Sequence, residues 1–210
     1  MARVSWYFDF ISPFAYFALD GLKRLPPGTE VRRVPILLAG LLKHWGQKGP
    51  AEVAPKRLWT YRSCVWIAKQ HGLPFRLPAA HPFNPLPYLR LAIAAGSSDA
   101  VLRAIFEALW TTGADPSDPA IVLGLGERFG VTPERLLDDS VKTALKENTD
   151  EAIRAGVFGV PSLVVDGEVF WGSDALGFAL AYLADPGILH WPDMERAASL
   201  PVAASRAAAG

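Results

Sequence analysis

The sequence predicts an α/β protein made of two separated units, strand–helix–strand at the start of the chain and strand–strand–helix near its end. Three observations predict this plan. Residues 4–11 alternate and are rich in aromatic side chains, as in a strand. The middle of the chain, residues 39–155, carries apolar residues mostly at helical spacing. Near the end, Asp166-Gly167 separates two short apolar runs, which is a strong hairpin signal.

The first unit begins with the strand at residues 4–11. Apolar residues recur at helical spacing from 13 to 25, and Pro26-Pro27-Gly28 ends that helix. Residues 30–38, rich in Val, Ile and Leu, predict a second strand. Strand, helix and strand at this spacing form a βαβ unit, so we expect its two strands to be parallel.

The middle of the chain is expected to be helical. A proline-rich loop covers residues 78–87. Asp118-Pro119 and Thr132-Pro133 each pair a capping side chain with a proline that suits the first helical position. The helical segments expected there are residues 39–48, 54–71, 88–95 and 101–110, the two that begin at Asp118 and Thr132, and residues 139–154.

The second unit contains the hairpin and a last helix. Its strands are expected at residues 162–165 and 169–171, on either side of Asp166-Gly167. Ser173-Asp174 is expected to cap the last helix, which ends near Ala184.

The two units together have the plan of a thioredoxin-like domain divided by a large all-helical insertion. Residues after Pro192 are rich in alanine and have little pattern, as in a frayed tail. The expected organisation is a discontinuous thioredoxin-like domain of residues 1–38 and 156–190, a helical insertion domain of residues 39–155, and a flexible tail of residues 191–210.

Composition excludes several classes of protein. The 210 residues are half apolar and carry 21 basic and 21 acidic side chains, so the chain can bury a core and has no overall signature of nucleic-acid binding. No apolar run approaches the roughly 18 residues needed to cross a bilayer. Met1-Ala-Arg leads directly into the first strand rather than into a signal peptide. We therefore expect a cytoplasmic protein that binds neither nucleic acid nor membrane.

Metal-ligating side chains are few and scattered. Cys64 is the single cysteine, which excludes an internal disulfide and a cysteine-based metal cluster. The histidines show no ligand spacing; they are His44, His71, His81 and His190. We therefore expect no metal site.

Ser12-Pro13 lies where the first strand turns into the first helix. Thioredoxin-like proteins carry a redox-active Cys-x-x-Cys pair at this corner, but here Ser12 and Ala15 occupy both positions. On local grounds alone, Ser12 is a helix N-cap and Pro13 a suitable first helical residue. The alternative interpretation is a hydroxyl that positions the thiolate of another molecule.

Three motifs, in order around the helical block, favour the second interpretation. They are Tyr7-Phe8-Asp9-Phe10-Ile11-Ser12-Pro13-Phe14, Phe158-Gly159-Val160-Pro161-Ser162 and Trp171-Gly172-Ser173-Asp174. On these motifs the chain resembles the 2-hydroxychromene-2-carboxylate isomerases and the kappa-class glutathione transferases, in the disulfide-isomerase-like branch of the thioredoxin fold. The resemblance spans nearly all of residues 4–185.

The resemblance implies glutathione as the cofactor and Ser12 as the catalytic residue. In such proteins this serine donates a hydrogen bond to the glutathione sulfur and favours the thiolate, as a short donor at a helix N-terminus can. Val160-Pro161 matches a cis-proline loop that pairs with the cysteinyl part of glutathione. Trp171, Gly172, Ser173 and Asp174 match the segment that holds the γ-glutamyl end.

Further site residues follow from the resemblance with less specific signals. Lys56 matches a cation near the glycine end of glutathione, and Asn84 matches an asparagine of the loop that covers the site. Lys43 is a candidate for the substrate carboxylate. Candidate walls of the substrate slot are Trp45, Phe83 and Tyr88, for which the alternative is an ordinary place in the core.

Two positions depart from the family pattern. Trp59 stands where relatives usually have tyrosine, and Ser63 stands where they usually have aspartate. The substrate loop typical of the isomerases is not recognisable in residues 49–53. Glutathione binding is therefore better supported than any particular substrate.

The resemblance implies a glutathione-dependent cis–trans isomerase of an aromatic-catabolism intermediate, of the 2-hydroxychromene-2-carboxylate type. The expected substrate is a small aromatic carboxylate, and the expected assembly is a homodimer. Two alternatives stay open: a kappa-type glutathione transferase or peroxidase that consumes glutathione, and a non-catalytic thioredoxin-fold binding module.

Overall fold

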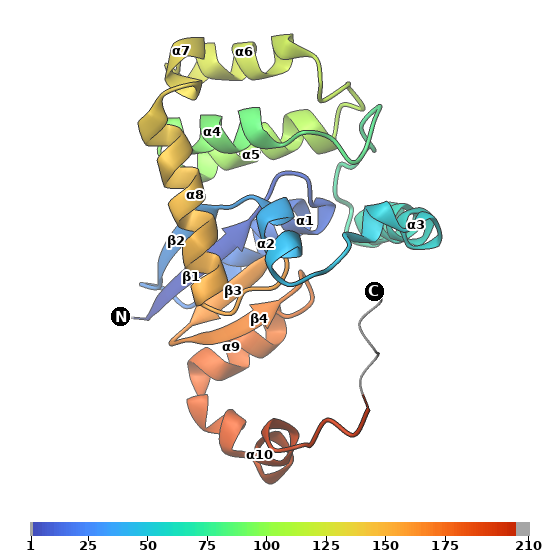
Figure 1. Ribbon diagram of the computed structural model, residues 1–210, viewed down its shortest axis with the longest axis vertical. Helices are drawn as coiled ribbons and strands as arrows, with labels where there is room; N and C mark the ends of the chain where they lie inside the picture. The colour runs from blue at the N-terminus through green and yellow to red at the C-terminus, as the bar shows by residue number, and fades with distance from the viewer. Residues whose placement is uncertain (1, 205–210) are drawn as a thin grey trace.

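The computed structural model describes residues 2–204 and contains a four-stranded sheet with the order β2-β1-β3-β4. β1 (Arg3–Phe8) is parallel to β2 (Glu30–Pro35) and antiparallel to β3 (Ser162–Val165). β3 in turn forms a hairpin with β4 (Glu168–Trp171). The predicted parallel βαβ unit and the predicted hairpin are confirmed, and the two units meet at the β1–β3 pair (Figure 1).

The hairpin turn explains why β3 and β4 pair as the sequence predicts. Asp166 and Gly167 both have positive φ, 50° and 91°, as a two-residue hairpin turn requires. Asp and Gly are the residues that tolerate this conformation best.

Helices cover the sheet and fill the insertion. Four helices of the insertion begin at side-chain caps, namely Ser98, Asp118, Thr132 and Asp138, so the two predicted cap-plus-proline starts are confirmed. The helical elements in chain order are α1 (Pro13–Gly21), η1 (Leu22–Arg24), α2 (Leu38–His44), η2 (Pro50–Glu52), α3 (Ala54–Gln70), α4 (Leu86–Ala94), α5 (Asp99–Trp110), α6 (Pro119–Phe129), α7 (Pro133–Leu136), α8 (Asp139–Arg154), α9 (Leu176–Ala184), η3 (Pro186–His190) and α10 (Pro192–Ala198).

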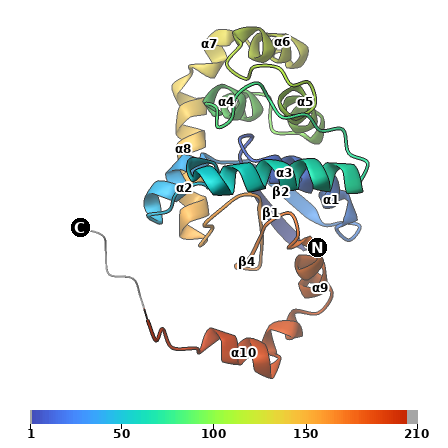
Figure 2. The same cartoon turned by 90° about the vertical axis from the view of Figure 1, so that its right-hand side faces the viewer.

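The helices are arranged in layers around the sheet. Helices α4–α7 are stacked at one end of the molecule, α9 and α10 lie at the other, and α8 runs from the stack down to the sheet (Figure 1). The view turned by 90° shows α3 as a long helix at the level of α1 and α2, between the α4–α7 stack and the α9–α10 end of the molecule (Figure 2). The thioredoxin-like domain with a helical insertion is therefore the observed architecture.

Two expectations for the end of the chain are wrong. Helix α9 begins at Leu176 after Ala175, with no side-chain cap, so Ser173-Asp174 does not cap it. Residues 192–198 form α10 rather than a patternless tail, because Pro192 at the first position and the acidic residues of the first turn favour a helix start. Residues 205–210 of the predicted tail lie outside the described residues.

An aromatic cluster joins the insertion to the sheet. The ring of Phe106, on α5, lies 4.7 Å from that of Phe10 and 5.9 Å from that of Phe8. Tyr16 of α1 and Trp6 of β1 complete its surroundings, with ring centroids at 6.2 Å and 6.4 Å. Because Phe106 is fully buried, this contact carries much of the packing between the two parts.

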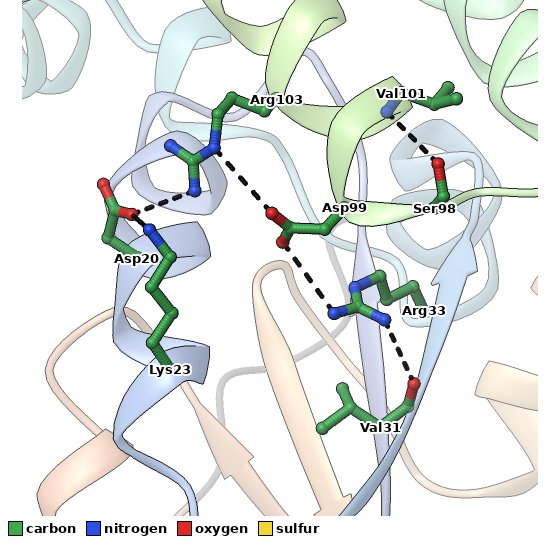
Figure 3. A network of polar contacts seen from close by, with 8 residues as sticks. All are labelled: Asp20, Lys23, Val31, Arg33, Ser98, Asp99, Val101 and Arg103. Carbon is green, nitrogen blue, oxygen red and sulfur yellow. Dashed lines mark hydrogen bonds and ion pairs between the residues drawn. The ribbon is translucent and has the colours of Figure 1, made fainter.

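Ion pairs rim the same junction. Asp20 of α1 pairs with Arg103 of α5 at 2.9 Å and with Lys23 at 2.7 Å. Asp99 of α5 lies 3.8 Å from both Arg103 and Arg33, the latter on β2 (Figure 3). The network therefore links α1, α5 and β2 around the aromatic cluster.

Replacing Phe106 should test how much the aromatic cluster contributes. Phe106→Ala is expected to lower the free energy of unfolding by about 3–5 kcal/mol, because it removes a buried ring and leaves a cavity. Urea denaturation followed by circular dichroism measures this. The matched control is Leu137→Ala, at a side chain that is 63% exposed, for which we expect a change within about 0.5 kcal/mol. Similar values for the two variants would contradict this account of the junction.

Candidate functional site

Ser12 lies at the N-terminus of α1 and faces the loop before β3. Its hydroxyl oxygen accepts a hydrogen bond from the Ala15 backbone N–H at 3.4 Å, as an N-cap does. The same hydroxyl is 3.4 Å from the Val160 carbonyl oxygen, to which it can donate. Both contacts are at the long limit of hydrogen bonding, so the hydroxyl can turn toward a better acceptor. Ser12 is thus both a helix cap and a donor available to a ligand.

The Val160-Pro161 peptide bond is cis, as the resemblance implied. The loop is held by its own neighbours: Gly172 N–H donates to the Pro161 carbonyl at 2.9 Å, and the Ser162 hydroxyl donates to the Gly159 carbonyl at 2.8 Å. Residues 12, 160 and 161 therefore come together although 148 positions separate Ser12 from Val160.

Glycines allow close packing on both sides of this loop. A Cβ at position 159 would lie 2.4 Å from Trp171 Nε1, so the indole rests directly on the Gly159 backbone. A Cβ at position 172 would lie 2.4 Å from Asp174 Oδ1, and Gly172 has a φ of 106°. The carboxylate of Asp174 therefore folds back over the start of its own segment.

A cavity of about 480 Å³ extends from the cis-proline loop along α1. It has the size of a small-molecule site. Its lining combines residues of the loop and of the segment 172–174 with apolar side chains of α1 and the end of α3, including Pro161, Ser173, Asp174, Phe17, Ala18 and Ile67. Of the residues predicted to bind glutathione, four line this cavity: Pro161, Gly172, Ser173 and Asp174.

Ser12, Val160 and Trp171 do not line this cavity. Three other predicted polar residues also lie outside it. Lys56, in the first turn of α3, and Lys43, in the last turn of α2, are exposed. Asn84 is also exposed, and its side-chain oxygen accepts a hydrogen bond from Leu86 N–H at 3.1 Å. Asn84 therefore has a local role at the start of α4, which leaves its amide N–H groups for other partners.

The predicted slot walls have different surroundings. Trp45 is 43% exposed, and its indole N–H donates to the Val157 carbonyl at 2.9 Å, which places it near the cis-proline loop. Phe83 is half-buried and packs against Tyr88 and Trp110. Tyr88 is 1% exposed, and its hydroxyl donates to the Pro116 carbonyl at 2.7 Å. Tyr88 is therefore a core residue rather than a slot wall, since its ring is enclosed by the insertion.

The two departures from the family pattern lie on α3. Trp59 is 68% exposed, and Ser63 is half-buried. Cys64, in the same helix, is fully buried, and burial raises the pKa of its thiol to about 12. It therefore supplies no reactive thiolate.

Asp9 is a site residue that the sequence analysis did not single out. Its carboxylate is fully buried and accepts from Ile11 N–H at 3.1 Å and from Leu38 N–H, the first residue of α2, at 2.8 Å. Burial raises the pKa of Asp9 to about 7, against the opposing effect of the backbone N–H donors. The available signal was an acidic residue inside an otherwise apolar aromatic strand.

His81 is a second residue close to Ser12 that the sequence analysis did not single out. Its ring Nε2 lies 2.9 Å from the Ile11 carbonyl oxygen, and its Nδ1 lies 2.8 Å from the Tyr61 hydroxyl. Burial lowers the pKa of the imidazole, and the hydrogen bond to Ile11 opposes that shift. No spacing rule connects His81 with Ser12, so the sequence carried no clear signal for this contact.

Among residues 2–204, no group of three or more His, Cys, Asp or Glu side chains is placed to hold a metal ion. Over the same residues, no helix combines the length and apolar character that crossing a bilayer requires.

The fold and this corner define a class: a thioredoxin-like protein whose first helix starts at a hydroxyl instead of a thiol pair. Residues 3–184 match the DSBA-like thioredoxin domain family, and the chain belongs to that family.

The relatives within this family include two groups of enzymes. The chain is 31% identical to a 2-hydroxychromene-2-carboxylate isomerase of Sphingobium xenophagum, over 87% of this chain and 98% of the relative. It is 30% identical to glutathione S-transferase kappa 2 of Caenorhabditis elegans, over 87% of this chain and 92% of the relative. A solved structure of a 2-hydroxychromene-2-carboxylate isomerase superposes with a TM-score of 0.74 at 26% identity, over 91% of this chain and 98% of that one.

The buried carboxyl of Asp9 makes stability depend on pH. Because the folded-state pKa, about 7, lies above the ordinary value of 3.8, the folded protein holds a proton that the unfolded chain releases between these values. The contribution of Asp9 to stability is therefore full at low pH and is lost as pH rises toward 7, by up to about 1.4 kcal/mol per pH unit.

Asp9→Asn is expected to remove this dependence, at some cost in stability at every pH. Urea denaturation gives the free energy of unfolding of both proteins at pH 5 and pH 7.5. Subtracting the values of the variant from those of the wild type cancels the contribution of the other titrating groups. If the free energies of unfolding of the two proteins differ by the same amount at pH 5 and at pH 7.5, Asp9 is not the source of the pH dependence.

Proposed function

We propose that this protein is a glutathione-dependent cis–trans isomerase that acts on an aromatic-catabolism intermediate of the 2-hydroxychromene-2-carboxylate type. The observation that carries the proposal is the Ser12 hydroxyl, placed at the N-terminus of α1 opposite the cis Val160-Pro161 loop. The 2-hydroxychromene-2-carboxylate isomerases among its relatives support the same reaction class, and the family membership supports the thioredoxin-like fold that places Ser12 at this corner.

The Ser12 corner suits a bound thiolate. A thiol has an ordinary pKa near about 8.5, and a hydrogen-bond donor together with the positive end of a helix dipole lowers it. The Ser12 hydroxyl makes only long contacts of 3.4 Å, so a sulfur anion next to it is a better acceptor than the Val160 carbonyl. The residue acts as a donor to sulfur rather than as a nucleophile.

The neighbouring segments offer partners to the rest of a glutathione molecule. The backbone of Val160, next to the cis bond, can pair with the cysteinyl residue as a strand edge does. Ser173 and Asp174, with Gly172 and Trp171, form the side suited to the γ-glutamyl group, whose carboxylate and ammonium both need polar partners. Lys56 is the proposed cation for the glycine carboxylate, and Asn84 a proposed contact from the covering loop.

The chemistry requires a reversible nucleophile and an apolar slot. Glutathione, when bound, supplies a thiolate for reversible addition to a conjugated carbon of the substrate, so that the bond between the two isomers becomes single and can rotate. The protein's part is to keep the sulfur anionic through Ser12. The proposed substrate contacts are Lys43 for the carboxylate and Trp45 and Phe83 for the aromatic ring.

A kappa-type glutathione transferase is the second candidate, because a relative of that name is 30% identical over most of the chain. The two differ in what happens to glutathione. Rapid, stoichiometric conjugate formation with chlorodinitrobenzene favours the transferase, and turnover of 2-hydroxychromene-2-carboxylate without loss of glutathione favours the isomerase.

A homodimer in the cytoplasm stays a prediction. Size-exclusion chromatography checks the oligomeric state, and cell fractionation checks the location.

Glutathione is expected to raise the melting temperature of the protein. A ligand that binds only the folded state stabilises it by about 2.7 kcal/mol at one hundred times its Kd. Thermal melts with increasing reduced glutathione measure the effect, with free glycine and glutamate at equal concentration as the control. A melting temperature that stays constant up to millimolar glutathione would contradict the proposed function.

Ser12→Ala is expected to lower isomerase turnover by about 10²–10³-fold, the usual loss when one donor to a developing anion is removed. It should also cost about 1 kcal/mol of stability as a lost N-cap. Ser98→Ala separates the two effects, because Ser98 caps α5 with the same 3.4 Å contact, to Val101 N–H. The Ser98 variant should lose similar stability and keep its turnover. Equal turnover in the two variants would remove Ser12 from the mechanism.

A further inference from the structure

Side chains of the helical insertion hold the two carbonyl groups that come just before Ser12. The indole N–H of Trp110 donates to the Phe10 carbonyl oxygen at 2.9 Å. The Nε2 atom of His81 lies 2.9 Å from the Ile11 carbonyl oxygen. A carbonyl can only accept, so Nε2 must carry the hydrogen, which fixes the tautomer of the neutral ring.

Tyr61 of α3 fixes the other side of the His81 ring. Its hydroxyl oxygen lies 2.8 Å from His81 Nδ1 and 2.8 Å from the His81 carbonyl oxygen. With Nε2 protonated, Nδ1 of the neutral ring is an acceptor, so the single Tyr61 hydroxyl hydrogen is shared between Nδ1 and the His81 carbonyl oxygen. The edges of Trp110 and Phe83 pack against the imidazole, with ring centroids at 5.4 Å and 5.9 Å. The ring therefore has a single orientation, with its N–H toward Ile11.

The backbone N–H groups of Ile11 and Ser12 are held by Asp9 and not by the insertion. Ile11 N–H donates to the Asp9 carboxylate at 3.1 Å, and Ser12 N–H donates to the Asp9 carbonyl at 3.1 Å. These two N–H groups are therefore satisfied by Asp9 within the loop, whereas the Phe10 and Ile11 carbonyl groups are satisfied by side chains of the insertion. Because buried backbone groups need partners, losing the His81 bond would leave the Ile11 carbonyl to find a new one by rotating the peptide that leads into Ser12.

The Ser12 hydroxyl depends on this peptide for its direction. Its own two contacts are both 3.4 Å long and constrain it weakly. We propose that His81, oriented by Tyr61, is a positioning residue for Ser12: it fixes the Ile11–Ser12 peptide and so aims the hydroxyl at the glutathione sulfur. The proposal rests on the proposed function, since it assigns a role in holding that sulfur.

The test measures the pKa of the glutathione thiol in the complex, from its ultraviolet thiolate absorbance as a function of pH, together with kcat and KM for 2-hydroxychromene-2-carboxylate. His81→Phe keeps a flat ring but removes the donor to Ile11. We expect it to raise the bound thiol pKa toward that of free glutathione and to lower kcat by about 10²-fold, the cost of a small misplacement in an active site. KM should change much less.

Three further variants separate positioning from ordinary stability. His81→Gln retains an N–H at the same distance along the side chain and is expected to recover most of the kcat. Tyr61→Phe removes only the hydroxyl that orients the ring and should shift the thiol pKa in the same direction by a smaller amount. Tyr16→Phe is the matched control, because it removes only a tyrosine hydroxyl whose hydrogen bond, to the Pro74 carbonyl at 2.7 Å, involves no atom of residues 9–12. It should leave the thiol pKa and kcat unchanged.

The outcomes distinguish this proposal from the proposed function. A wild-type protein that does not lower the glutathione thiol pKa overturns the proposed function and the role of His81 with it. A wild type that does lower it, with His81→Phe folded and unchanged in thiol pKa and kcat, overturns the positioning role alone. If His81→Phe does not fold, Tyr61→Phe decides, and wild-type values for that variant overturn the proposal.

Discussion

The need to satisfy buried backbone groups between β1 and α1 constrains the rest of the molecule. Residues 9–12 form a corner that is almost closed to water, so each N–H and C=O group there requires a protein partner. Asp9 supplies the acceptors, and Trp110 and His81 supply the donors. Two of these three side chains belong to the insertion. The backbone of the corner that leads into Ser12 therefore has all these partners only when the insertion is packed against it.

The packing of the helical insertion against the thioredoxin-like domain depends more on buried aromatic rings than on ion pairs. The ion pairs at the rim of the junction are partly exposed, with Asp20 47% and Arg103 28% accessible, and exposed pairs contribute only about 0–1 kcal/mol each. The buried rings around Phe106 contribute several times as much. The ionic network in Figure 3 sets the alignment of α1, α5 and β2 around that packing.

The sequence predicted features with local signals better than features made by distant residues. The hairpin at Asp166-Gly167, the caps at Asp118 and Thr132 and the Ser12 cap all follow from short-range chemistry. The cis bond at Pro161 could be predicted only through the family motif. Tyr88 was misassigned because an aromatic residue after a loop has the same pattern in a core as in a slot. The contact of His81 with Ile11 spans 70 positions, and no periodicity encodes it.

The burial of Cys64 has a consequence for how the protein meets oxidising conditions. Thiol–disulfide exchange requires a thiolate, and the only cysteine of the chain has a pKa near 12 and no solvent contact. Glutathione disulfide therefore finds no reactive thiolate on this protein with which to form a mixed disulfide. Under the proposed function, activity during oxidative stress therefore follows the supply of reduced glutathione, and no mixed disulfide at Cys64 interrupts it.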